Sequence, residues 1–199
     1  MPVKAVIFDL DGTITEPYFD FDVIRTEMGL TNDTGPVLEA MKKMTPDRRR
    51  EAERILDYHE QRAVEQSKLN AGSRETLEKL RQMGLHIGLL TRNRRSNAEA
   101  VAQKHGLYFD AIVDRDDGPV KPDAFGVLSL CRRFGIEPHE AIVVGDYLFD
   151  LLCARTAGAQ AVLLVNTEKA KEFVEHADFT IYRLDQVLDI VQQTNGCGV

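Results

Sequence analysis

The sequence predicts an α/β fold, in which a parallel sheet is covered by helices on both faces. Apolar residues spaced three or four apart, typical of helices, recur between short apolar runs bounded by Gly, Pro or Asp, typical of strands. Strict alternation of strand and helix favours a parallel sheet. The expected strands are Val3–Phe8, Leu85–Leu90, Ala111–Val113, Ala141–Val144, Ala161–Val165 and Phe179–Ile181. The expected helices are Ser73–Met83, Ser96–His105, Asp123–Phe134, Leu148–Ala157, Glu168–His176 and Leu184–Gln193.

One stretch breaks this alternation. Between Glu16 and Asn70 the sequence predicts no strand, and Pro46–Leu69 is expected to form one long charged helix with Thr45 as its N-cap. We therefore expect an all-helical insertion over residues 16–70 within a core domain of residues 1–15 and 71–199. Because the insertion follows the first strand, it is expected to lie over the carboxyl end of that strand.

Composition narrows the possible partners. The 199 residues contain 25 Lys and Arg against 32 Asp and Glu, a formal net charge of −7 that argues against a nucleic-acid partner. The apolar runs are too short to cross a membrane, and the N-terminus carries no cleavage-type segment, so a cytoplasmic chain without a membrane partner is expected. Cys131, Cys153 and Cys197 show no metal-ligand spacing, and the first two are expected to be small core residues.

Two acidic motifs follow predicted strands. The first strand ends in DLDGT (residues 9–13), which places Asp9 and Asp11 two residues apart before a glycine. The strand Ala141–Val144 ends in GDYLFD (residues 145–150), which contains Asp146 and Asp150. Taken singly, the first motif also fits an ordinary turn and the second an ordinary helix N-terminus.

Together, the two motifs require a counter-charge. The carboxyl ends of parallel strands border one crevice, where four carboxylates would repel one another strongly. A bound hard cation resolves that conflict, and oxygen ligands of this charge suit Mg²⁺, which leaves room for a phosphate.

Two further positions suit an anionic substrate. Thr91 ends the strand Leu85–Leu90, and its hydroxyl, with the backbone N–H groups of Arg92 and Asn93, is placed to hold a phosphoryl oxygen. Lys121 precedes a helix that Pro122 pre-organises. The alternatives are an N-cap region for Thr91 and a solvated surface lysine for Lys121.

The four motifs in this order resemble the haloacid-dehalogenase-like phosphohydrolase superfamily over nearly the whole chain. They are DLDGT (9–13), LLT (89–91), VKP (120–122) and GDYLFD (145–150). The resemblance implies a Rossmann-like core, and the insertion resembles the small helical cap of the phosphoglycolate-phosphatase-like branch.

The resemblance also implies roles for individual residues. Asp9 is the expected nucleophile, forming an aspartyl-phosphate, and Asp11 the acid and base. Thr91 and Lys121 stabilise the phosphoryl group. Mg²⁺ is held by Asp9, Asp146 and the backbone carbonyl of Asp11. The expected substrate and phosphate contacts are Thr91, Arg92, Asn93 and Lys121, and Asp150 is expected to orient a metal-bound water or Lys121.

We therefore expect a Mg²⁺-dependent phosphatase acting on a small phosphorylated metabolite, as a monomer or weak homodimer. Asp11 argues against a dehalogenase, because halide leaves without a proton. The alternatives are a sugar-phosphate mutase, a non-enzymatic phospho-acceptor of receiver type, and a catalytically silent interaction protein. The DLDGT motif argues against the acceptor, and the complete set of acids against the silent protein.

Overall fold

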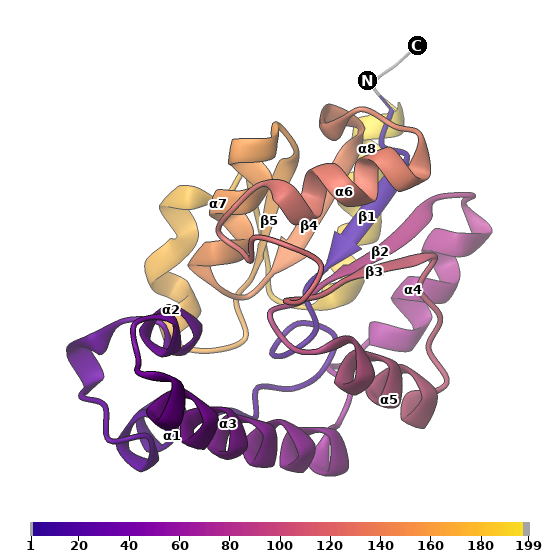
Figure 1. The fold of residues 1–199 in the computed structure, drawn as a ribbon. Helices are drawn as coiled ribbons and strands as arrows, with labels where there is room; N and C mark the ends of the chain where they lie inside the picture. Colours follow the sequence, from indigo (N-terminus) through magenta and orange to yellow (C-terminus); the bar gives the residue numbers. More distant parts are fainter. Residues whose placement is uncertain (1, 197–199) are drawn as a thin grey trace. The chain divides into compact units, whose positions relative to one another are not determined.

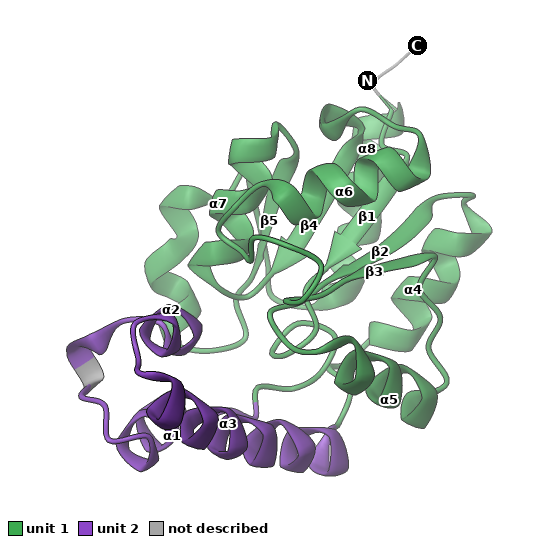
Figure 2. Cartoon of the chain, in the orientation of Figure 1, with its two compact units in different colours: residues 1–17, 68–199 green, residues 18–67 purple. Residues whose placement is uncertain are grey.

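The computed structural model describes residues 2–196, which form two compact units (Figure 2). Unit 1 combines residues 1–17 with residues 68–199, and unit 2 spans residues 18–67. Cys197 lies outside the described residues.

Unit 1 contains a six-stranded parallel sheet in the order β3-β2-β1-β4-β5-β6 (Figure 1). β1 lies between β2 and β4, and its last residue, Phe8, pairs with Leu89 on one side and Val144 on the other. This sheet confirms the predicted α/β class. The strands are β1 Ala5–Phe8, β2 His86–Leu90, β3 Ala111–Val113, β4 Ala141–Gly145, β5 Gln160–Leu164 and β6 Phe179–Ile181.

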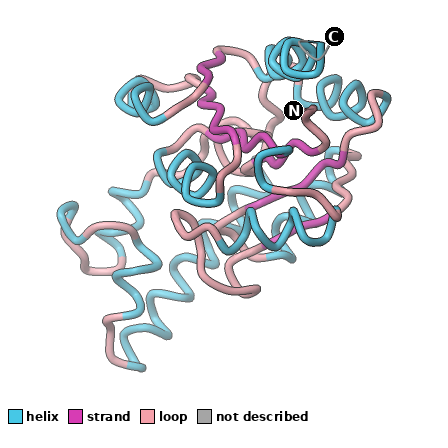
Figure 3. Tube along the Cα trace, turned by 90° about the horizontal axis from the view of Figure 1, so that it is seen from above, coloured by secondary structure: helices cyan, strands magenta, loops and turns pink. Residues whose placement is uncertain are grey.

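Helices cover both faces of this sheet, as the tube view shows (Figure 3). Every residue of β1 is buried although successive side chains point to opposite faces, so apolar layers lie on both sides. α6 (Phe125–Phe134) and α7 (Leu148–Ala157) pack against each other and against the central strands. α4 (Ser73–Gln82) packs against β2 and α8 (Val187–Gly196). Among the described residues, the remaining α-helix of unit 1 is α5 (Arg95–His105).

The two helical segments nearest the C-terminus differ from the prediction. Lys169–His176 is a 3₁₀ helix, in which residues three apart stand above one another. The ion pair between Lys169 and Glu172, at 2.6 Å, has this spacing. The next segment divides into a short 3₁₀ turn, Leu184–Gln186, and α8.

Unit 2 is entirely helical and has a core of its own. It contains α1 (Phe21–Glu27), a 3₁₀ turn (Asn32–Thr34), α2 (Val37–Lys42) and α3 (Pro46–Gln66). Asp20 caps α1, because its side chain accepts hydrogen bonds from the backbone N–H groups of Asp22 and Val23 in the first turn. The buried core residues are Ile24, Met28, Val37, Met41, Ala52 and Leu56.

The two segments of unit 1 that lead into and out of residues 18–67 pair with each other. The backbone N–H of Glu16 donates to the carbonyl of Lys68 at 2.9 Å, and that of Asn70 donates to Ile14 at 3.0 Å. This pairing explains why the long helix predicted over Pro46–Leu69 ends at Gln66: the residues after it are extended and hydrogen-bonded to the other segment.

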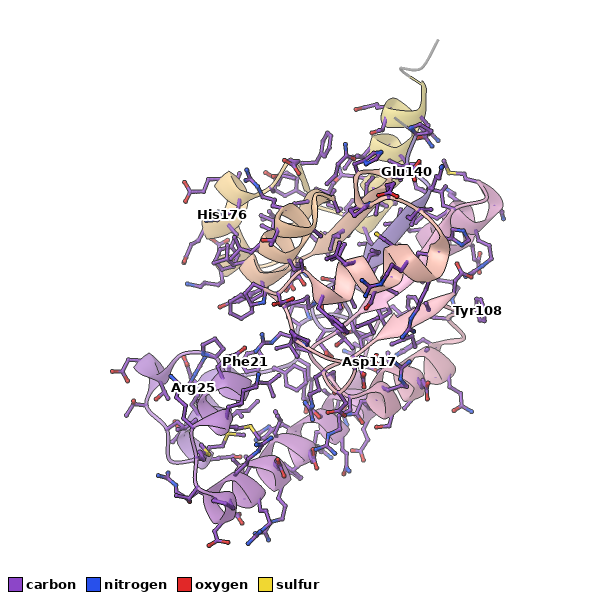
Figure 4. All side chains as sticks on the ribbon, turned by 45° about the horizontal axis from the view of Figure 1, so that its top comes forward. Phe21, Arg25, Tyr108, Asp117, Glu140 and His176 are labelled. Carbon is purple, nitrogen blue, oxygen red and sulfur yellow. The ribbon has the colours of Figure 1, made fainter. Side chains whose placement is uncertain are left out.

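The amino ends of β1 and β4 carry an ion pair. Glu140, labelled in Figure 4, lies 2.6 Å from the ammonium of Lys4, whose backbone N–H donates to the carbonyl of Glu140. Cys131 and Cys153 are buried in the apolar core, as predicted. Among the described residues, no helix combines the length and hydrophobicity needed to span a membrane.

A core substitution tests this packing. Leu130 in α6 is fully buried, so Leu130→Ala is expected to lower the free energy of unfolding by about 2–5 kcal/mol through lost burial and a cavity. Urea unfolding measures this, with Leu128→Ala as the control, because Leu128 lies on the same helix and is only partly buried. Equal losses in the two variants would contradict the assigned core.

Candidate active site

The candidate site lies where the strand order changes direction, between β1 and β4. Chain connections run outward from these two neighbouring strands, and ligands of open α/β sheets bind beyond the carboxyl ends of strands at such a point. Asp9 follows β1 directly, and its backbone N–H donates to the carbonyl of Val144 at 2.9 Å. Asp146 follows β4 directly. The sheet register therefore brings the two acidic motifs together.

Lys121 is buried among oxygen acceptors from three other segments. Its Nζ lies 2.5 Å from Oδ1 of Asp9 and 2.6 Å from Oδ1 of Asp150. The third acceptor is the carbonyl of Leu90, the last residue of β2, at 2.9 Å. An ammonium has three donors, so this set uses all of them. Lys121 is thus a buried charge at the centre of the site, not a solvated surface lysine.

The carboxylates outnumber this cation. Asp9, Asp146 and Asp150 each offer an oxygen within 4.8 Å of the others. Burial, with the charges of Asp150 and Asp11, raises the pKa of Asp9 to about 7 despite the opposing effect of Lys121. Burial and the charges of Asp9 and Asp150 also raise the pKa of Asp146 well above its usual value. Burial alone would lower the pKa of Lys121. The negative charges of Asp150 and Asp9 have the larger combined effect, so the pKa of Lys121 is raised.

This arrangement fits a hard divalent cation. Three carboxylates face one ammonium, and the available donors are oxygens, which Mg²⁺ prefers. The group also includes Asp150, which the sequence analysis expected to orient a metal-bound water or Lys121. In the structure Asp150 forms an ion pair with Lys121. The group does not include the side chain of Asp11, whose expected contribution is its backbone carbonyl.

Two glycines allow the acidic motifs to approach closely. A Cβ at Gly145 would lie 2.2 Å from the Cβ and Cγ of Asp150. At Gly12, φ is +93°, and a Cβ would lie 2.3 Å from a carboxylate oxygen of Asp146. The glycines in both motifs are therefore required by the packing of the carboxylates.

The loop after β2 holds the remaining predicted residues. Thr91 is buried, and its Oγ1 accepts the backbone N–H of Asn93 at 3.0 Å, so this N–H is used within the loop. The side chain of Asn93 donates to Oδ2 of half-buried Asp11 at 3.1 Å. The guanidinium of Arg92 donates to the carbonyl of Lys121 and lies 4.9 Å from the ring centroid of Phe149. All eight predicted residues thus lie in loops at the carboxyl edge of the sheet or, for Asp150, in the first turn of α7.

Two asparagines that the sequence analysis did not single out hold the DLDGT loop. Asn70 Nδ2 donates to the carbonyls of Gly12, Thr13 and Thr15 at 3.0, 2.8 and 3.0 Å. Asn166 Nδ2 also donates to Gly12. The sequence could have indicated Asn166, because it is a polar residue directly after the predicted apolar strand Ala161–Val165. It could not have indicated Asn70, since the pairing of its segment with residues 14–16 is a tertiary feature.

Comparison with known proteins identifies the family of this chain. A family model described as haloacid dehalogenase-like hydrolase matches residues 3–158. The chain belongs to this hydrolase family. Among the relatives of this chain, an uncharacterized hydrolase of Saccharomyces cerevisiae is 28% identical over 97% of this chain and 93% of its own. A phosphoglycolate phosphatase of Nitrosospira multiformis is 30% identical over 80% of this chain and 82% of its own.

A solved structure of a hydrolase from Pseudomonas syringae has the same fold. It superposes with a TM-score of 0.77 at 23% identity, covering 96% of this chain and 98% of that one. The resemblance inferred from the four motifs is therefore confirmed at the level of family and fold.

Removing the buried cation tests the charge balance. Lys121→Met is expected to lower the free energy of unfolding by about 3 kcal/mol or more at pH 7, because Asp9 and Asp150 lose their shared partner. The matched control is Lys171→Met, since the Lys171–Glu168 pair is exposed and is expected to contribute less than about 1 kcal/mol. Urea unfolding without added metal compares them, and equal stability of both variants would refute the assigned role of Lys121.

Proposed function

We propose that this hydrolase is a Mg²⁺-dependent phosphatase that cleaves a small phosphomonoester through an aspartyl-phosphate on Asp9. The observation that carries the proposal is the group of buried Asp9, half-buried Asp146 and buried Asp150 beside Lys121, at the point where the strand order of the sheet changes direction. Relatives named phosphoglycolate phosphatase support a phosphorylated substrate. The same likeness supports residues 16–70 as a cap domain on the α/β core.

Asp9 is the nucleophile. Lys121 holds its Oδ1, and we assign the attack on phosphorus to Oδ2, so that an O–P bond forms as the ester P–O bond breaks. The attacking carboxylate must be ionised, and burial among other acids disfavours that state. Mg²⁺, when bound, would supply positive charge that offsets these carboxylates and the incoming phosphate. Asp9, Asp146 and the backbone carbonyl of Asp11 would hold it, with Asp150 close by.

Asp11 is the acid and base. In the first step its proton passes to the leaving alkoxide, and in the second it takes a proton from the water that attacks the aspartyl-phosphate. Release of inorganic phosphate then restores the Asp9 carboxylate. Asp11 is half-buried whereas Asp9 is buried, which suits a group that must reach both the leaving oxygen and water.

The phosphoryl group is stabilised by a hydrogen bond from Thr91 and by the positive charge of Lys121. The Thr91 oxygen accepts the N–H of Asn93, so its own hydroxyl proton remains to be donated to a phosphoryl oxygen. Lys121 contributes charge next to the same position. Arg92 borders this site from its position against Phe149, where its guanidinium also fixes the Lys121 backbone. Its charge adds to the attraction of an anionic substrate.

The function is tested by phosphate release. The native chain is expected to release inorganic phosphate from small phosphomonoesters, phosphoglycolate included, only with Mg²⁺, and Asp9→Asn is expected to reduce kcat by about 10³-fold or more. Asp189→Asn, an exposed aspartate in α8, is the matched control and should retain native activity. Full activity of Asp9→Asn would exclude the mechanism.

The same assay separates the alternatives. A sugar-phosphate mutase would isomerise its substrate with little phosphate release. A phospho-acceptor would become labelled on Asp9 without turnover.

Metal binding is tested separately from turnover. Mg²⁺ is expected to raise the Tm of the native chain, because it binds the folded carboxylate group and not the unfolded chain. Asp146→Asn is expected to weaken Mg²⁺ binding by at least about 10-fold, measured by calorimetry, since it removes one ligand. The control is Asp116→Asn at an exposed position. Undiminished Mg²⁺ affinity in Asp146→Asn would count against the assigned ligand set.

A further inference from the structure

The side chain of Asn93 points to a carboxylate. This residue is buried, and its Nδ2 donates to Oδ2 of Asp11 at 3.1 Å. A phosphate ligand in this loop would direct its donors to the position of the substrate. Here the amide donor is directed to the proposed acid and base.

The orientation of the Asn93 amide is determined by its other end. Oδ1 accepts the backbone N–H of Arg94 at 2.8 Å, and a backbone N–H can only donate, so the oxygen end is identified. Nδ2 of Asn97, in the first turn of α5, donates to the same Oδ1 at 2.9 Å. With two donors on its oxygen, the amide must present its nitrogen to Asp11.

The backbone of Asn93 is anchored as well. Its N–H donates to Oγ1 of Thr91 at 3.0 Å, and its carbonyl accepts the N–H of Arg115 at 3.3 Å. Main chain and side chain are thus both fixed before any substrate binds. Such a supporting residue can hold a reacting group within the narrow range of positions that catalysis needs.

We propose that Asn93 is a positioning residue that holds the Asp11 carboxyl group toward the leaving oxygen, and that Asn97 keeps Asn93 in this orientation. The inference rests on the proposed function. Because Oδ2 of Asp11 accepts the amide N–H, the transferable proton belongs on Oδ1. That O–H bond breaks as the O–H bond of the departing alcohol forms.

The test uses two leaving groups. 4-Nitrophenolate leaves without a proton, whereas an alkoxide needs one. In Asn93→Ala, kcat for the alkyl phosphate that the native chain cleaves best is expected to fall about 10- to 100-fold, and kcat for 4-nitrophenyl phosphate by less than about 3-fold. Inhibition by inorganic phosphate is expected to be unchanged, because this proposal assigns the Asn93 amide to Asp11 and not to phosphate.

A double-mutant cycle tests the role of Asn97. Asn97→Ala alone should lower kcat in the same leaving-group-dependent way, and it should cause no further loss in the Asn93→Ala background. Asn195→Ala controls for general destabilisation, because Asn195 hydrogen-bonds Val3 at the opposite edge of the sheet. It is expected to affect the two substrates equally.

The possible failures are distinguishable. If the native chain is active and Asn93→Ala loses the same factor on both substrates, the positioning role is wrong and the residue is merely structural. If inhibition by phosphate weakens together with that equal loss, Asn93 is a phosphate ligand instead. If the native chain releases phosphate from neither substrate, the proposed function fails, and this inference fails with it.

Discussion

The structure depends on one buried ammonium. Lys121 is the shared partner of a carboxylate after β1, a carboxylate in α7 and the last carbonyl of β2. Removing a charge from water is costly unless it is paired and hydrogen-bonded, and here every donor of the ammonium has an acceptor. The loop that carries Lys121 is therefore fixed against three other segments, and its ammonium offsets part of the repulsion between the two acidic motifs.

The sheet concentrates polar groups at one edge. Both faces are apolar and covered, so β1 and β4 have room for charge only where they end. The DLDGT loop emerges there, and Asn70 and Asn166, which are far apart in the sequence, donate hydrogen bonds to its carbonyls. Asn93, in the loop after β2, donates a hydrogen bond to Asp11, the second acid of the DLDGT loop. Rigidity at the site thus comes from neutral amides, which hold the backbone and carboxylates without adding to the charge imbalance.

Much of the fold could be predicted from local patterns. Each strand was expected within two residues of its observed bounds. A short apolar run between Gly, Pro or Asp residues is typical of a buried strand, so both its type and its ends can be predicted. The 3₁₀ geometry of Lys169–His176 escaped prediction, because the apolar spacing of this segment also fits an α-helix. The early end of α3 at Gln66 escaped prediction because it depends on pairing between distant segments.

The candidate site was predictable to the same extent. Residues that follow strands, such as Asp9, Thr91 and Asp146, could be assigned to one edge from sequence alone. Contacts among side chains could not. The amide of Asn93 facing Asp11 and the guanidinium of Arg92 on Phe149 follow from the tertiary structure, and neither residue type signals its partner.

The paired segments around residues 14–16 and 68–70 have a consequence for how this architecture diversifies. Backbone hydrogen bonds hold these two segments side by side, and they offset the entropic cost of bringing the ends of the intervening chain together. The remaining entropic cost grows only slowly with loop length. The paired segments therefore form a fixed attachment point for the inserted residues. A helical insertion of a different length could replace this one without changing the sheet or its acidic edge.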